Sequence, residues 1–201
     1  MAAPAIDLLL TDLDGVVRHF DRSVADTLEV THGLEVGSLR REAFEHPRGQ
    51  AAITGGLTRS AWADEVGAAV GSPEAAHAWL GTWGAADPVM ADLIRTVRAA
   101  GVPVAVLTNG TDTIHDELAT VGLDAAFDHV FCTWFIGLAK PDPRVFAHVC
   151  ASLDVQPARV LFVDDSPGNV DGARDAGLLG RNFAGVEDLR SALTDLGVSV
   201  G

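Results

Sequence analysis

The chain has 201 residues, enough for one buried α/β domain and a modest insertion but too few for two full-sized domains. Hydrophobic residues make up 48% and charged residues 21% of the chain, so no long stretch is expected to be disordered. The formal net charge of -14 repels polyanions, which argues against nucleic acid or an anionic membrane surface as the main partner.

The sequence lacks an apolar run of about 18 residues, and its beginning, MAAPAIDLLL, lacks a basic region. We therefore expect a cytoplasmic protein with no membrane-spanning helix and no signal peptide. The cysteines, Cys132 and Cys150, fit neither a CxxC motif nor a zinc-ligand spacing. They are expected to be buried as small apolar side chains.

Three apolar runs end in polar side chains, as is typical of buried strands that break into turns. The runs are residues 5–11, 103–110 and 159–166, and their polar ends are Asp12 and Asp14, Thr108 and Asn109, and Asp164 and Asp165. In an open parallel sheet, ligands bind outside the carboxyl ends of the strands. The three polar clusters are therefore expected to meet at one crevice.

The segments around these runs complete an alternation of strands and helices. We predict a helix from Ile114, capped by Thr111 or Asp112, a strand over 129–133, a helix over 143–151 capped by Asp142, a strand over 178–183 and a helix over 186–196. The pattern predicts an α/β fold with a doubly wound parallel sheet.

Residues 18–86 interrupt the alternation and carry only helical signals. Candidate helix N-caps are Ser23, Ser38, Thr58 and Ser72, and Asp87 with Pro88 opens the helix that ends at Gly101. We predict a catalytic core of residues 1–17 and 87–201, and a small all-helical cap of residues 18–86 inserted after the first strand. Trp62, Trp79 and Trp83 are expected in the core of this cap.

The four aspartates at the strand ends would repel one another unless a cation lay between them. Oxygen ligands at this density suit Mg²⁺. Only one of the 14 basic residues is a lysine, Lys140, which indicates a position that needs a compact ammonium rather than a planar fork. Thr108 and Asn109 would donate hydrogen bonds to phosphate oxygens. An aspartate such as Asp12 can then attack phosphorus, while Asp14 exchanges protons with the leaving group and water.

Four motifs resemble those of the haloacid dehalogenase (HAD) superfamily in both order and spacing. They are TDLDGVV at 11–17, LTNG at 107–110, GLAKPDPRVF at 137–146 and FVDDSPGNVDGARDAG at 162–177. The last two are similar in particular to the subfamily of glucose-1-phosphatase-like enzymes and the N-terminal phosphatase domain of soluble epoxide hydrolase. The resemblance implies a Rossmann-like core and a phosphatase.

The resemblance also implies the role of each site residue. Asp12 is the nucleophile, Asp14 the general acid and base, and Thr108, Asn109 and Lys140 bind the phosphate. Mg²⁺ is expected on the Asp12 carboxylate, the Asp14 backbone carbonyl and Asp165. Asp164 is expected to act through water or to orient Lys140, and Asn169 is expected to brace the loop.

The expected substrate is a small phosphorylated metabolite, and the cap is expected to select it. Candidates for contacting its leaving group are His19, Arg22, His46, Arg48 and Arg59, with residues 46–56 read as a specificity loop. Residues 134–136 (Trp-Phe-Ile) are expected to pack against the cap or a subunit partner. The sequence is compatible with a monomer or a homodimer.

Three alternatives remain open at this stage. A 2-haloacid dehalogenase attacks carbon, but that branch of the superfamily usually lacks the second acidic residue, here Asp14, and needs no Mg²⁺. A phospho-accepting receiver module of signalling proteins carries its acidic pair first and has no helical insertion after its first strand. A non-catalytic binding module would be expected to have lost at least one of the motif residues.

Overall fold

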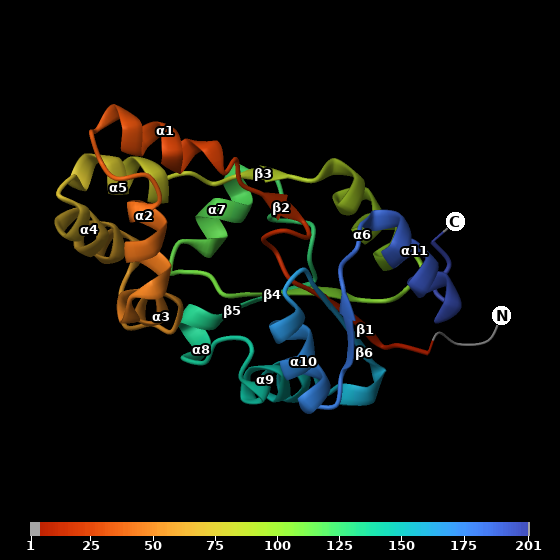
Figure 1. The fold of residues 1–201 in the computed structure, drawn as a ribbon. Helices are drawn as coiled ribbons and strands as arrows, with labels where there is room; N and C mark the ends of the chain where they lie inside the picture. The colour runs from red at the N-terminus through yellow and green to blue at the C-terminus, as the bar shows by residue number, and fades with distance from the viewer. Residues whose placement is uncertain (1–4, 201) are drawn as a thin grey trace.

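A computed structural model describes residues 5–200 and contains a five-stranded parallel sheet. Its strands are β1 (Leu8–Thr11), β4 (Val104–Thr108), β5 (His129–Cys132), β6 (Val160–Asp164) and β7 (Leu179–Asn182). Their order is β5-β4-β1-β6-β7, so the first strand lies in the centre (Figure 1). The predicted doubly wound α/β fold is confirmed.

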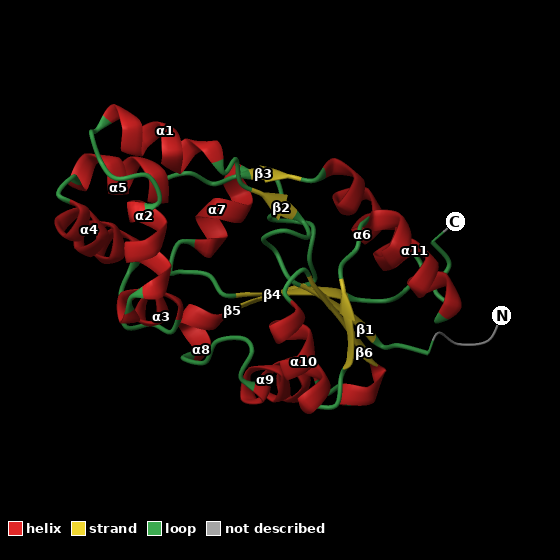
Figure 2. Cartoon of the chain, in the orientation of Figure 1, coloured by secondary structure: helices red, strands yellow, loops and turns green. Residues whose placement is uncertain are grey.

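Helices cover both faces of the sheet because the strand residues alternate between two hydrophobic clusters. On one face, Leu9 and Val106 pack with α6 (Pro88–Ala99), α7 (Ile114–Thr120) and α11 (Val186–Asp195). On the other face, Leu10 and Phe162 pack with α9 (Pro143–Leu153) and α10 (Pro167–Asp175). Figure 2 shows the sheet between these two helical layers.

A group of helices with its own hydrophobic cluster follows the first strand, and it lies to one side of the sheet in Figure 1. Its elements are α1 (Ser23–Thr31), α2 (Ser38–Arg40), a π-helical turn (Arg41–Glu45), α3 (Pro47–Ile53), α4 (Arg59–Val70) and α5 (Pro73–Leu80). We call this group the cap. Trp62 and Trp79 pack in its cluster. The Trp83 ring instead lies against the Arg59 guanidinium, whose central carbon is 4.8 Å from the ring centre.

A short antiparallel strand pair joins the cap to the sheet. In it, β2 (Arg18–His19) pairs with β3 (Ala85–Ala86), so that Arg18 lies opposite Ala86. Only helical signals were found for residues 18–86, because two-residue strands have no periodicity to detect. We call the pair the neck.

Four helix N-caps were predicted correctly: Thr58 caps α4, and three other capping side chains each precede a proline. Ser72 and Asp87 accept hydrogen bonds from backbone amides of α5 and α6, and Asp142 does so for α9. Ser23 and Ser38 were wrong as caps, because each is the first residue of its helix.

Residues 46–56 were predicted to form a loop, but they contain the helix α3. His46 caps this helix by accepting a hydrogen bond from the Arg48 amide, and Pro47 occupies its first turn. Gly49 lies close to the π-helical turn, where an added Cβ would be 2.4 Å from the Ala43 carbonyl oxygen. Gly49 therefore allows two helical turns to pack closely.

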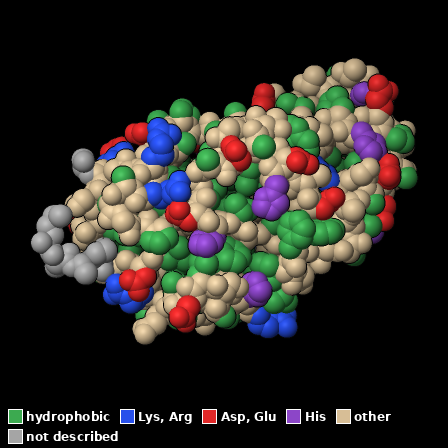
Figure 3. Space-filling model, turned by 180° about the vertical axis from the view of Figure 1, so that it is seen from behind, with side chains coloured by type: hydrophobic (Ala, Val, Ile, Leu, Met, Phe, Trp, Pro, Cys, Tyr) green, Lys and Arg blue, Asp and Glu red, His purple; other side chains and the backbone are tan. Residues whose placement is uncertain are grey.

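The two cysteines are buried and unbridged, as expected, and burial raises the pKa of Cys132 to about 11. Within residues 5–200, no helix combines the length and the apolar character that a membrane span requires. On the face shown in Figure 3, basic side chains lie in isolated groups among acidic ones.

Candidate active site

The polar residues predicted at the strand ends come together at one edge of the sheet. Asp12 directly follows β1, while Thr108 ends β4 and Asp164 ends β6. Because β1 pairs in parallel with both β4 and β6, the three carboxyl ends are neighbours. Asp12 is held there by its backbone amide, which donates to the Val163 carbonyl at 2.8 Å.

Lys140 places a buried ammonium between two of the carboxylates. Its Nζ donates to Asp12 Oδ1 at 2.7 Å and to Asp164 Oδ2 at 2.8 Å, and it lies 5.6 Å from the centre of the Phe162 ring. Only 5% of the residue is exposed. A lysine fits this narrow space as a compact point charge, which agrees with the absence of any other lysine in the chain.

Asn109 holds the loop that carries this lysine. Its Oδ1 accepts from the Lys140 amide at 2.9 Å, and its Nδ2 donates to the Lys140 carbonyl at 3.1 Å. Thr108, at the end of β4, is buried. The Asn109 side chain therefore fixes the backbone of the ammonium-bearing residue by two hydrogen bonds.

The two adjacent acidic residues at the end of β6, Asp164 and Asp165, lie in different surroundings. Asp164 is fully buried and accepts from Lys140, from the Ser166 amide and from Asn169 Nδ2, which lies 3.0 and 3.1 Å from its two oxygens. Asp165 is exposed and leans against Gly15, where an added Cβ would be 2.2 Å from Asp165 Oδ2. Asp164 is thus satisfied by protein donors, whereas Asp165 faces the loop after Asp12.

Three carboxylates form a group that fits a divalent cation. One oxygen each from Asp12, Asp164 and Asp165 lies within 4.8 Å of the others. The neighbouring Lys140 ammonium balances only one of these three negative charges. A hard cation with oxygen ligands, such as Mg²⁺, suits this donor set.

The crowding is reflected in the acidity of the carboxyls. Burial raises the pKa of Asp12 to about 7, with Asp164 adding to the rise and Lys140 opposing it. Partial burial and the charge of Asp164 also raise the pKa of Asp165. Both hydrogen bonds given to Asp12 end on Oδ1, from Lys140 and from the Leu13 amide at 2.7 Å each. Its Oδ2 receives none from the described residues.

Asp14 is bound by an arginine that the sequence reasoning missed. Arg18 Nε donates to Asp14 Oδ1 at 2.6 Å and Nη2 to Oδ2 at 3.1 Å, which is a two-point ion pair. Arg18 is itself buried and donates from Nη1 to Glu117 Oε2 at 2.7 Å. One signal points to Glu117, which shares a face of α7 with the buried Ile114 and Leu118. Arg18 carries no such signal, since residues 14–18 form a turn rather than a helix.

The other cap candidates have partners away from the carboxylates. His19 lies in the neck with Nε2 3.3 Å from Asp87 Oδ2, and His46 caps α3. Arg48 contacts Glu42 and Glu65 within the cap, and the Arg22 carbonyl accepts from Arg40. The contacts thus give the side chains of His19, His46 and Arg48 structural roles, whereas the contact of Arg22 involves only its backbone carbonyl.

The Trp134–Ile136 run forms part of a helical turn, α8 (Thr133–Ile136), and contacts the cap. Trp134 Nε1 donates to the Leu57 carbonyl at 2.8 Å. Gly55 packs against the Trp134 carbonyl oxygen, which would be 2.8 Å from an added Cβ. The expected packing against the cap is confirmed.

Comparison with known proteins identifies the family. A model of the haloacid dehalogenase-like hydrolases matches residues 6–177. The chain belongs to this family. It is therefore a hydrolase, and the sequence resemblance is confirmed.

The similar proteins include both phosphatases and dehalogenases. The chain is 27% identical over 182 residues to validoxylamine A 7'-phosphate phosphatase of Streptomyces hygroscopicus subsp. limoneus, covering 84% of this chain and 81% of that protein. It is 33% identical over 114 residues to flavin mononucleotide hydrolase 1 of Arabidopsis thaliana, covering 55% of this chain but only 45% of that protein. Haloacid dehalogenases are also among the relatives and the similar structures.

The fold agrees with that of solved structures in the family. A HAD-family enzyme of Bacteroides thetaiotaomicron, crystallised with magnesium and inorganic phosphate, superposes with a TM-score of 0.72 at 21% identity. The match covers 89% of this chain and 93% of the other. At this identity, the likeness supports the fold alone.

The contact between Gly15 and Asp165 yields a test of the cation site. We expect Gly15→Ala to weaken Mg²⁺ binding by about 10- to 100-fold, because its methyl group displaces the Asp165 carboxylate. Gly101→Ala is the matched control, since Gly101 has a φ of 87° against 90° for Gly15 and nothing within 4 Å of an added Cβ. Calorimetric titration with Mg²⁺ measures the difference, and equal affinity in the two variants would contradict the site.

The raised pKa of Asp12 yields a prediction about stability without metal. Between its ordinary value of 3.8 and about 7, the folded protein holds a proton on Asp12 that the unfolded chain releases. Raising the pH through this window therefore lowers the free energy of unfolding. Asp12→Asn removes the effect, so in EDTA the free energy of unfolding of the variant, relative to that of the wild type, should be higher by a few kcal/mol at about pH 8 than at about pH 4. Urea unfolding at both pH values measures this, and a difference independent of pH would refute it.

Proposed function

We propose that this chain is a Mg²⁺-dependent phosphatase that hydrolyses the phosphomonoester of a small metabolite through an aspartyl-phosphate on Asp12. The observation that supports it most strongly is the group of three carboxylates beside a single buried ammonium. A phosphate brings further negative oxygens to this edge of the sheet, so its binding requires a second positive charge. Oxygen ligands from Asp12 and Asp165 suit that cation, and the Asp14 carbonyl is the expected third protein ligand.

In this proposal, bound Mg²⁺ screens the phosphate oxygens from the carboxylates and neutralises charge that develops on them. An Asp12 carboxylate oxygen attacks phosphorus, and the bond from phosphorus to the leaving oxygen breaks. Lys140 keeps its ammonium against Asp12 and the transferred group, while Asp164 and Asn109 hold that ammonium in place. Thr108 is assigned to the phosphate oxygens.

Asp14 has the proton-transfer role. It gives a proton to the leaving oxygen in the first step and takes one from the attacking water in the second step. Water then adds at phosphorus, the bond to Asp12 breaks, and inorganic phosphate is released. The two aspartates thus divide nucleophilic and proton-transfer chemistry between them.

The dehalogenase relatives make attack on carbon the second candidate. Halide departs without a proton and without new anionic oxygens, so that reaction uses neither Asp14 nor a divalent cation. The Asp165 carboxylate would then add only repulsion to the site. The carboxylate group therefore favours the phosphatase.

The proposal predicts metal-dependent hydrolysis of p-nitrophenyl phosphate. We expect activity to be lost in EDTA, restored by Mg²⁺, and reduced by at least about 10³-fold in Asp12→Asn, which removes the nucleophile. Phosphate release measures this, and halide release from 2-chloropropionate is assayed in parallel. Wild-type activity that survives EDTA, or halide release without phosphatase activity, would exclude the proposal.

The narrow space around the ammonium yields a separate prediction. Lys140→Arg keeps the charge but adds a planar group between Asp12, Asp164 and the Phe162 ring, where only 5% of the residue is exposed. We expect kcat to fall by on the order of 10²- to 10³-fold, as in Lys140→Met. Thermal melts show whether each variant is folded. A Lys140→Arg enzyme within a few fold of the wild type would show that charge alone is sufficient.

A further inference from the structure

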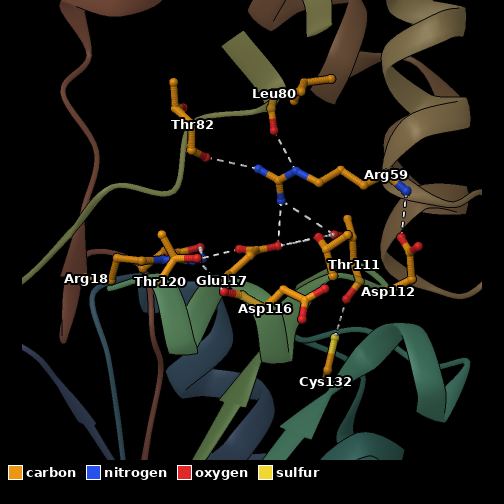
Figure 4. Close-up of polar contacts among 12 residues, drawn as sticks. Arg18, Arg59, Leu80, Thr82, Thr111, Asp112, Asp116, Glu117, Thr120 and Cys132 are labelled. Atoms are coloured by element: carbon orange, nitrogen blue, oxygen red, sulfur yellow. Dashed lines mark hydrogen bonds and ion pairs between the residues drawn. The ribbon is translucent and has the colours of Figure 1, made fainter. Parts of the chain in front are cut away.

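A chain of alternating charges connects Asp14 to the cap, and Figure 4 shows the part of it from Arg18 through Glu117 to Arg59. It runs from Asp14 to Arg18, then to Glu117 on α7, and then to Arg59 at the start of α4. We call these four residues the ion-pair chain. Arg18 and Glu117 have side chains that are 3% and 2% exposed, and the Arg59 side chain is 14% exposed. The chain is therefore mostly shielded from water.

The first link fixes the direction of the Asp14 carboxylate. Two parallel N–H donors of Arg18 bind its two oxygens, which restrains both the position and the plane of the group. Each carboxylate oxygen has a further lone pair for a substrate or water. The Asp14 side chain remains 43% exposed, so it is held but still accessible.

The middle link makes Arg18 depend on Glu117. A buried carboxylate is stable only when its hydrogen-bonding capacity is satisfied. Glu117 receives Arg18 Nη1 on Oε2 at 2.7 Å, and Arg59 Nη1 and Thr113 Oγ1 on Oε1 at 2.8 and 2.7 Å. Moving Arg59 away would remove the charged donor from Oε1 and leave that oxygen only the hydroxyls of Thr113 and Thr111.

The last residue, Arg59, binds both the loop before α7 and the end of the cap that leads into the neck. The Arg59 amide donates to Asp112 Oδ1 at 2.6 Å. Its guanidinium donates to the Leu80 carbonyl at 2.6 Å and to the Thr82 carbonyl at 3.2 Å, and it stacks on Trp83. These carbonyls lie just before β3 of the neck. Displacement of the cap relative to α7 would therefore pull Arg59 from Glu117.

We propose that Arg18 is a positioning residue for Asp14, and that Glu117 and Arg59 couple this position to the seating of the cap on the core. The inference rests on the proposed phosphatase activity. In this arrangement, proton transfer by Asp14 is fully effective only when the cap is seated, so that the leaving group is protonated inside the closed site.

The test compares two leaving groups. The alkoxide of an alkyl phosphate such as glycerol phosphate needs a proton from Asp14 as it departs, whereas 2,4-dinitrophenolate departs without one. The ratio kcat/KM is used because it reports only the steps up to departure of the leaving group. For alkyl phosphate we expect a loss of about 10²-fold in Asp14→Asn and of about 10-fold or more in Arg18→Lys and Arg59→Met. For dinitrophenyl phosphate, Arg18→Lys and Arg59→Met should stay within about threefold of the wild type.

A double variant separates positioning from general loosening of the structure. In the Asp14→Asn background, Arg59→Met should change kcat/KM for the alkyl phosphate by less than about twofold, since there is no proton donor left to position. Arg59→Lys, which can still reach Glu117, should recover part of the loss. The control is Arg98→Lys, because Arg98 also joins a carboxylate, Asp128, to backbone carbonyls but lies outside the ion-pair chain.

The outcomes are distinct. The inference is supported if Arg18→Lys and Arg59→Met lower kcat/KM only for the alkyl phosphate, and if Arg59→Met has no such effect in the Asp14→Asn background. Equal losses with both substrates, or a full further loss in the double variant, would overturn it while leaving the phosphatase intact. A wild type that hydrolyses neither ester would instead overturn the proposed function. Arg59→Met carries the test if Arg18→Lys does not fold, since Glu117 keeps Arg18 and Thr113 as partners in that variant.

Discussion

The site depends on one buried ammonium, that of Lys140. Asp12 and Asp164 come from separate strands, and without a positive charge between them they could not lie so close together in a place shielded from water. Much of the surrounding structure fixes that charge. Asn109 binds both backbone polar groups of Lys140. On α10, Gly172 allows the helix to approach the Pro141 carbonyl, where an added Cβ would be 2.0 Å away.

This arrangement also explains the unequal roles of the two acids at the end of β6. Asp164 uses its oxygens on Lys140, Asn169 and the Ser166 amide, so it belongs to the scaffold of the ammonium. Asp165 has no such set of donors in the described structure and lies against the Gly15 backbone instead. Asp164 thus balances the charge of Lys140, whereas the Asp165 carboxylate has no cationic partner among the described residues.

The sequence was informative where structure is determined by neighbouring residues. Apolar runs located the strands, and Asp or Ser before proline located three helix starts, because burial periodicity and capping act within a few positions. The loop expected at 46–56 is helical instead, because His46 and Pro47 start α3 and Gly49 permits close packing. The ion-pair chain was not predicted, since Arg18 lies 99 positions and Arg59 58 positions from Glu117, and no local pattern encodes such a pairing.

The neck gives the molecule a modular character. Because Arg18 and Ala86 are paired, the polypeptide leaves the core and returns to it at adjacent points. An insertion anchored in this way behaves as a closed loop, whose entropic cost grows only slowly with length. Helices inserted at this point can therefore be exchanged or enlarged at little expense to the sheet. The Arg59–Glu117 contact limits this freedom, since a new insertion would also have to supply a partner for the buried glutamate.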